Sequence, residues 1–159
     1  MNAAGTLRAR PLRVVLRMVG LAGLVLVGTG CQSYHWRNDV MAAETDARES
    51  GKHLFVFYKW YLDSHSNRML SETLSDPKVE KLFRDTVNVV LESGYPEFDA
   101  YVQRFGVHTY PATIILAPDG TYQVRLGFIP KDRFIAFVER AKQPRAPRGS
   151  RRVPPLQSP

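Results

Sequence analysis

Residues 105 to 116 read FGVHTYPATIIL and place a helix end, a loop and a strand within twelve residues. Gly106 marks the helix end, because glycine readily takes the left-handed conformation that stops a helix. After Pro111, the run ATIILA is rich in β-branched residues and predicts a strand. Asp119-Gly120 is a turn signal between this run and TYQVRLGF, so the two runs predict an antiparallel hairpin.

Two further strands and several helices are expected around this hairpin. HLFVFY, residues 53–58, is too continuously apolar for an edge strand and is typical of a buried central one. TVNVVLE, residues 86–92, predicts another strand. Helix signals precede or separate the strands: Asn38 or Asp39 as an N-cap with Gly51 as a stop, a helix through Met69 and Leu70, Ser75 or Asp76 before Pro77, PEFDAYVQRF up to Phe105, and the amphipathic PKDRFIAFVERA.

The order of these elements predicts an α/β fold. Strands joined through helices run parallel and need helices on both faces, whereas the closing hairpin is antiparallel. We therefore expect a mixed four-stranded sheet flanked by helices, with an extra helix at the N-terminal side. The expected domain covers residues 38–142.

The net charge of +7 belongs to the ends of the chain. Residues 1–30 and 143–159 each carry four arginines and no acid, which leaves 14 of the 22 basic side chains against all 15 acidic ones in between. The domain is thus nearly neutral, and its composition gives no indication of the basic stripe that is typical of a nucleic-acid-binding protein, so we expect no nucleic-acid partner. Residues 143–159, rich in arginine and proline, predict a disordered tail, either solvated or in contact with anionic phospholipid or cell-wall polymer.

The N-terminus has the pattern of an export signal. Basic residues give way to the apolar run MVGLAGLVLVGTG, whose helix would rise about 20 Å, short of a bilayer core of about 30 Å. The run ends at Cys31, the only cysteine, and VGTGC resembles the lipobox of bacterial lipoproteins, although Gly28 replaces the usual leucine. We expect a signal peptide over 1–30, lipidation of Cys31 as the mature N-terminus, a tether over 31–37 and a place in the cell envelope; an ordinary signal peptide or an uncleaved anchor is the alternative.

Several motifs together resemble the thioredoxin-like superfamily, and most closely its exported domains that begin with an extra helix. The motifs are HLFVFY before a tryptophan-containing loop, DPKVEKLF, RFGVHTYPATIIL and PDGTYQVRLGF. The resemblance as a whole covers about residues 36–142. Pro111 stands where the family keeps a cis-proline. The resemblance implies a thioredoxin-like fold and a peptide-binding groove beside that proline.

The family's redox chemistry uses Trp-Cys-x-x-Cys at the start of the helix after the central strand, where the helix end lowers the thiol pKa. Two registers are open here: Met69 as the family methionine puts Asp63 and Ser66 at the cysteine positions, and Trp60 as the family tryptophan puts Tyr61 and Ser64 there. Neither supplies sulfur. In the first register, the family's buried acid falls on Phe57. We expect no disulfide oxidoreductase activity and no cofactor.

The loop sequence Asp63-Ser64-His65-Ser66 permits three other interpretations. A hydrolase would use Ser64 or Ser66 as nucleophile, a histidine such as His65 or His108 as base, and Asp63 to orient that base, but no G-x-S-x-G elbow is present. A metal site could draw on Asp63, His65 and His108, without a tight ligand pair to support it. The simplest interpretation is a helix cap formed by Asp63, Ser64 or Ser66.

A capped helix start leaves room for binding. Aromatic residues from the loop and from HTYP would line the family groove, a composition suited to a protein or glycan surface, although packing in the core would explain Tyr58 equally. We expect a redox-inactive binding or scaffold module whose partner is an unidentified envelope protein or peptide; the alternatives are an enzyme with altered chemistry and a structural envelope protein. The expected degenerate active-site loop consists of Trp60, Tyr61, Asp63, Ser64, His65 and Ser66, and the expected groove and cis-proline loop consist of His108, Thr109, Tyr110 and Pro111; Tyr58, Trp60, Tyr61 and Tyr110 supply the aromatic content.

Overall fold

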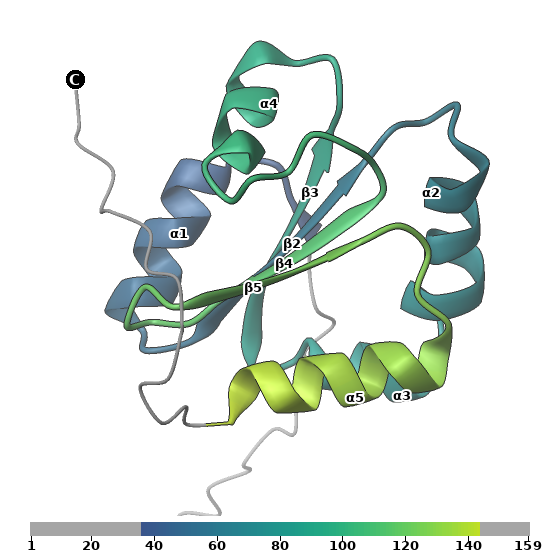
Figure 1. Cartoon of the computed structure of the whole chain (residues 1–159). Coiled ribbons are helices and arrows are strands. Elements are labelled where there is room, and N and C mark those ends of the chain that lie inside the picture. Colours follow the sequence, from purple (N-terminus) through teal and green to yellow (C-terminus); the bar gives the residue numbers. More distant parts are fainter. Residues whose placement is uncertain (1–35, 144–159) are drawn as a thin grey trace, which may run out of the picture. The chain divides into compact units, whose positions relative to one another are not determined.

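The computed structural model describes residues 36–143. These residues form one five-stranded sheet, with strand order β1-β3-β2-β4-β5, and helices on both of its faces (Figure 1). In chain order the elements are β1 (Trp36–Arg37), α1 (Val40–Glu49), β2 (His53–Lys59), α2 (Ser64–Arg68), the π-helical segment η1 (Met69–Leu74), α3 (Pro77–Leu82), β3 (Thr86–Glu92), α4 (Pro96–Gln103), β4 (Ala112–Leu116), β5 (Tyr122–Leu126) and α5 (Lys131–Lys142).

Strand β2 occupies the centre of the sheet, as its continuous apolar sequence predicted. Residues 54–58 are all buried, because helices cover both faces. β2 pairs in parallel with β3 and antiparallel with β4, and β4 continues through the turn at Gly120, where φ is +81°, into β5. The mixed sheet and its closing hairpin are confirmed.

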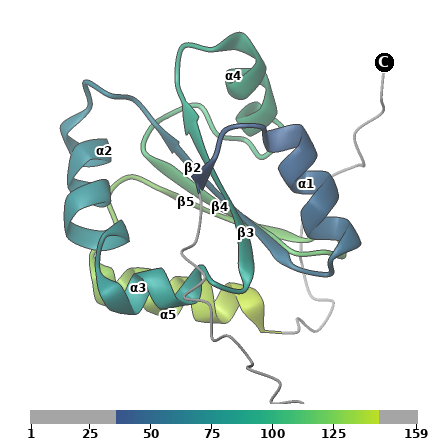
Figure 2. The same ribbon diagram turned by 180° about the vertical axis from the view of Figure 1, so that it is seen from behind.

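Two hydrophobic clusters fill the spaces between the sheet and its helices. One lies under α1 and α4 and includes Leu54, Val56 and Tyr58 of β2. The other lies under η1, α3 and α5 and includes Phe55 and Phe57 of the same strand. The alternation along β2 sends successive side chains to opposite clusters. Figure 2 shows the result from behind, with α1 and α4 on one side of the sheet and α2, α3 and α5 on the other.

The prediction of four strands was wrong by one. Trp36 and Arg37, which fall within the predicted tether, form the short strand β1 and pair with Asn88 and Val89 of β3. The Trp36 ring packs against Phe55 and Phe83, at centroid distances of 5.7 and 5.6 Å. A two-residue strand carries no periodicity that a sequence pattern could reveal, and tertiary contacts alone hold it. Trp36 and Arg37 therefore belong to the sheet, although the predicted tether included them.

The local signals at helix ends agree with the structure. The carboxylate of Asp39 accepts the Ala42 amide at the start of α1, and that of Asp76 accepts the Lys78 amide at the start of α3. Gly106 follows α4 with φ +73°, in the left-handed region where a side chain would be strained.

The expected signal peptide, Cys31 and residues 144–159 of the expected tail lie outside the described residues. Of the tail, only Gln143 is described, as the C-cap of α5. Within residues 36–143, no helix has the length and apolar character needed to cross a membrane.

Candidate functional site

The loop that follows the central strand leads directly into the start of α2, and Asp63 caps this helix. Its side-chain oxygen Oδ2 accepts the backbone amide of Ser66 at 2.6 Å, which satisfies one of the amides left open at a helix start. The capping prediction is confirmed, with Asp63 as the residue that provides it.

Ser66 connects the helix start back to the loop. Its side chain is fully buried, and its Oγ accepts the backbone amide of Trp60 at 3.3 Å. The Asn67 side chain also stabilises the loop, because its amide donates a hydrogen bond to the Tyr61 carbonyl at 3.1 Å. The aspartate and serine side chains that replace the family thiols in the first register thus stabilise the backbone around them.

Opposing effects act on the pKa of the Asp63 carboxyl. Partial burial raises this pKa, but hydrogen bonds from the hydroxyl and the backbone amide of Ser66, together with the nearby His65, lower it by more. The net result is a pKa below the ordinary value of an aspartate. Asp63 is therefore a charged cap at neutral pH, placed at the positive end of the helix dipole.

The helix boundary favours one of the two registers. Because α2 begins at Ser64, Asp63 stands at the N-cap and Ser66 one turn further, in the positions that the first register gives to the thiol pair. Tyr61 lies in the loop before the helix. Phe57, at the position of the family's buried acid, is fully buried among apolar side chains.

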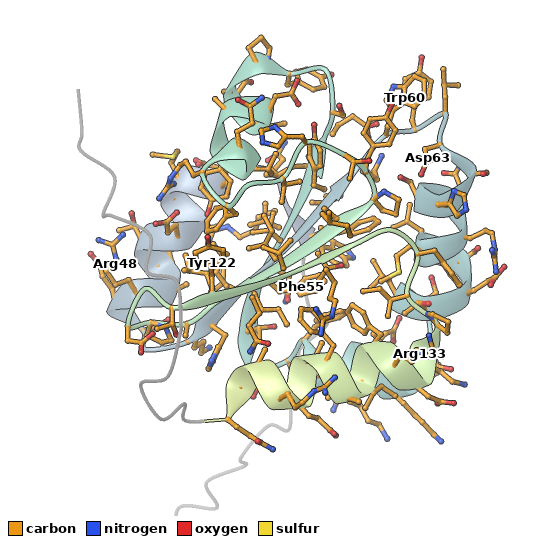
Figure 3. All side chains as sticks on the ribbon, viewed as in Figure 1. Arg48, Phe55, Trp60, Asp63, Tyr122 and Arg133 are labelled. Carbon is orange, nitrogen blue, oxygen red and sulfur yellow. The ribbon has the colours of Figure 1, made fainter. Side chains whose placement is uncertain are left out.

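Aromatic side chains gather beside this loop. The ring of Trp60 lies 5.2 Å from that of Tyr110 and 6.1 Å from that of Tyr61, measured between centroids. The peptide bond between Tyr110 and Pro111 is cis, as the resemblance implied. Figure 3 shows Trp60 near Asp63 at one end of the molecule. We call Trp60, Tyr61 and Tyr110 the aromatic cluster.

The aromatic residues that were expected to line the groove differ in how far their side chains are exposed to solvent. Tyr61 and its neighbour Leu62 are each 62% exposed, whereas Tyr58 is only 5% exposed. The hydroxyl of Tyr58 hydrogen-bonds Ser93 at 2.9 Å and Asp99 at 2.8 Å, so this residue joins β2 to α4. Of the two interpretations of Tyr58, packing in the core is the one that the structure supports. Tyr58 therefore offers no surface to a ligand.

The two histidines do not complete a catalytic or metal site. His65 is exposed, and its Nδ1 lies 3.8 Å from Asp63 Oδ1. Among the described residues, no hydrogen bond joins a histidine to Ser64 or Ser66, and no three His, Asp, Glu or Cys side chains lie close enough to hold a metal ion. His108 and Thr109 are exposed in the loop before the cis-proline. The hydrolytic and metal interpretations thus lack the geometry that each requires.

Sequence reasoning missed an ion pair at the end of the central strands. Lys59 Nζ donates to Glu92 Oε2, and the two residues are direct partners in the parallel pairing of β2 with β3. The signal was available, since both residues end their strands with opposite charges. The pair stabilises the C-terminal ends of β2 and β3, where the loop to α2 begins.

Comparison with solved structures relates this architecture to known proteins. The oxidised C-terminal domain of DsbD from Neisseria meningitidis is 21% identical, with a TM-score of 0.60, over 68% of this chain and 100% of that one. A thioredoxin from Thermus thermophilus is 22% identical, with a TM-score of 0.59, over 68% and 86% of the two chains. The fold is thioredoxin-like. A structure described as DsbH oxidoreductase agrees, with 12% identity and a TM-score of 0.57 over 69% and 84% of the chains.

No family model and no curated protein matches the chain. At these identities, the structural likeness establishes the thioredoxin-like fold and with it the predicted α/β architecture. The function of this chain therefore has to be argued from the residues at the start of α2 and beside the cis-proline.

Proposed function

We propose that this protein is a redox-inactive binding or scaffold module of the bacterial cell envelope, held at a membrane by a lipid on Cys31. One observation carries the redox-inactive part of the proposal: the helix start where the first register locates the family's thiol pair holds Asp63 and Ser66. The Asp63 carboxylate caps the helix by accepting the Ser66 amide, and the Ser66 hydroxyl oxygen accepts the Trp60 amide of the loop.

Thiol and disulfide exchange requires a thiolate that attacks a disulfide sulfur. Cys31 is the only cysteine of the chain, and its expected modification would remove its thiol. A buried serine hydroxyl at the second position cannot transfer electrons. The neighbours named thioredoxin or oxidoreductase therefore share the scaffold, while the proposed role here is binding.

The aromatic cluster supplies the surface for binding. Trp60 and Tyr110 are partly buried, and Tyr61 projects into solvent. Aromatic side chains of this kind contribute apolar area together with a hydrogen-bonding group, which suits them to protein surfaces. The proposed occupant is an extended segment of an envelope protein lying between the loop and the cis-proline.

An insulin-reduction assay tests the redox part. The chain from Gln32 to Pro159, which contains every described element and both hydrophobic clusters, should give no turnover. A matched variant, Asp63→Cys with Ser66→Cys, installs a thiol pair in the first register and should gain turnover, whereas Tyr61→Cys with Ser64→Cys should gain less. Turnover by the parent chain would contradict the proposal, and an inactive first-register variant that still folds would contradict the register.

The binding part is tested by capture from envelope extract. Trp60→Ala with Tyr110→Ala should abolish capture of the partner, because these substitutions remove two of the three rings of the aromatic cluster. Tyr95→Ala is the matched control, since Tyr95 is 53% exposed and lies at the start of α4. A partner that is captured equally by all three proteins does not bind the groove.

The anchor is tested separately, on the full chain expressed in bacteria. Cys31→Ser should move the protein from the detergent phase to the aqueous phase, because it removes the proposed lipidation site. Unchanged partitioning would refute lipidation and would leave the groove hypothesis intact.

A further inference from the structure

A second surface lies along β5 and α5, away from the aromatic cluster. A hollow of about 370 Å³ is lined by nine residues, of which three are arginines and none is acidic. The arginines are Arg125 on the edge strand β5 and Arg133 and Arg140 on α5, and all three are exposed. We call these three residues the arginine face.

The arginine face is not neutralised from within the domain. None of its members forms an ion pair with a residue of the described range 36–143; Arg140 donates only to the Ala136 carbonyl of its own helix. By contrast, Lys131 and Lys142 of the same helix are paired, with Asp76 and Asp85. The paired cations thus face α3, and the unpaired ones lie beside β5.

The acids of α5 lie on a different stripe of the helix. Arg133 and Arg140 are seven residues apart, so they share a stripe two turns long, about 10 Å. Asp132 and Glu139 follow the same spacing one position earlier, which places them about 100° around the helix. This segregation concentrates positive charge on the side of the helix next to the sheet edge.

Apolar groups lie between the arginines. Leu126 is 53% exposed at the end of β5, and the guanidinium of Arg125 lies over the Phe137 ring at 5.3 Å. Phe128 also lines the hollow. A surface with an apolar floor and a cationic rim matches the boundary of a lipid bilayer, where acyl chains meet charged headgroups.

We propose that the arginine face docks on the surface of an anionic phospholipid membrane. Guanidinium groups bind phosphate oxygens in a bidentate manner, and each basic residue near an anionic leaflet adds to the attraction. The three cations come from both a helix and the edge strand and stand around one hollow, so together they offer several contacts to an extended anionic surface. The sequence after Lys142 adds four arginines and no acid.

Docking in this way leaves the aromatic cluster accessible. In Figure 3, Trp60 lies near the top of the view and Arg133 lies beside α5 near the bottom. The arginine face therefore goes beyond the proposed groove function, and it does not depend on lipidation of Cys31.

Vesicle sedimentation tests the proposal with the chain from Gln32 to Pro159, which lacks Cys31. The protein should bind vesicles of phosphatidylcholine that contain phosphatidylglycerol, and it should not bind pure phosphatidylcholine. Arg125→Gln, Arg133→Gln and Arg140→Gln together should lower the partition coefficient by roughly a hundredfold, about fivefold for each charge. Binding should also weaken as salt is raised.

Three controls separate the arginine face from the total charge of the domain, from the C-terminal tail and from a general affinity for polyanions. Lys78→Gln, Lys81→Gln and Arg84→Gln remove the same charge from α3 and its C-terminal end and should have a much smaller effect. A chain ending at Gln143 should retain binding that depends on the arginine face. Equal losses in both triple variants, complete loss on removing the tail, or binding to poly-glutamate in preference to anionic vesicles would each overturn the proposal.

Discussion

Removal of the carboxylate at the start of α2 provides a quantitative test of the proposed structural role of the loop. Asp63→Ala deletes the carboxylate that accepts the Ser66 amide. Ser66 is fully buried, so its backbone amide is left without this hydrogen-bond acceptor. Loss of an N-cap costs about 1 kcal/mol, and an unsatisfied buried donor costs about 1–3 kcal/mol. Because the two descriptions overlap, we expect a loss of about 2 kcal/mol in the free energy of unfolding, with a fall in Tm of about 8 °C.

The negative charge of Asp63 adds a pH-dependent contribution to the free energy of unfolding. Asparagine caps helices about as well as aspartate but carries no charge, so Asp63→Asn should cost about 0.5–1 kcal/mol at neutral pH through the helix dipole. The folded-state pKa of Asp63 is lowered, so its contribution is complete above the unfolded-state pKa of about 4 and is lost as pH falls through the folded-state value. The difference between the parent and Asp63→Asn should therefore disappear in acid, whereas that between Asn and Ala should remain.

Urea denaturation of the chain from Gln32 to Pro159, followed by circular dichroism at several pH values, measures these differences. Ser64→Ala is the matched control, since Ser64 is exposed at the first helical position, and it should change stability by less than about 0.5 kcal/mol. If Asp63→Ala proves as stable as the control, Asp63 does not act as a structural cap. An increase in the Asp-to-Asn difference on acidification would refute the sign of the pKa shift.

Two other substitutions test contacts that hold the domain together. Tyr101→Phe removes the hydroxyl that donates to buried Glu44 at 2.7 Å and should cost about 1–3 kcal/mol in urea unfolding, whereas Tyr95→Phe at an exposed site should be neutral. Trp36→Ala removes a ring that packs on two core phenylalanines and should cost about 2–3 kcal/mol; an unchanged unfolding midpoint would show that β1 contributes nothing to the stability of the domain.

Much of the candidate site could be predicted because it depends on local rules. An oxygen side chain before a helix is a common N-cap, so the sequence offered Asp63, Ser64 and Ser66 as candidates, and the structure shows that Asp63 is the cap. The cis bond at Pro111 was expected for another reason, the resemblance of FGVHTYPATIIL to the thioredoxin-like superfamily, and the structure shows it. For Tyr58 the sequence left two roles open, in the core or in the groove, because strand alternation does not reveal that its hydroxyl hydrogen-bonds the side chains of Ser93 and Asp99.

The arginine face was missed for a different reason. Charge summed over the whole domain is near zero, and this total conceals a separation of signs around α5. The seven-residue spacing of Arg133 and Arg140 is visible in the sequence, but Arg125 joins them only when β5 lies beside α5, as in Figure 1.

The sequence by itself determined the nature of the elements: the buried central strand, the hairpin, the helix ends and the absence of a thiol pair at the start of α2. These follow from hydrophobic periodicity, backbone preferences and side-chain chemistry, all of which act over a few residues. Only the tertiary structure decided that Trp36 and Arg37 join the sheet, that Tyr58 belongs to the core, and that an arginine of β5 shares a surface with two arginines of α5. The first two depend on contacts between residues about 40 to 50 positions apart, and the third depends on how a strand and a helix pack, so no local pattern predicts them.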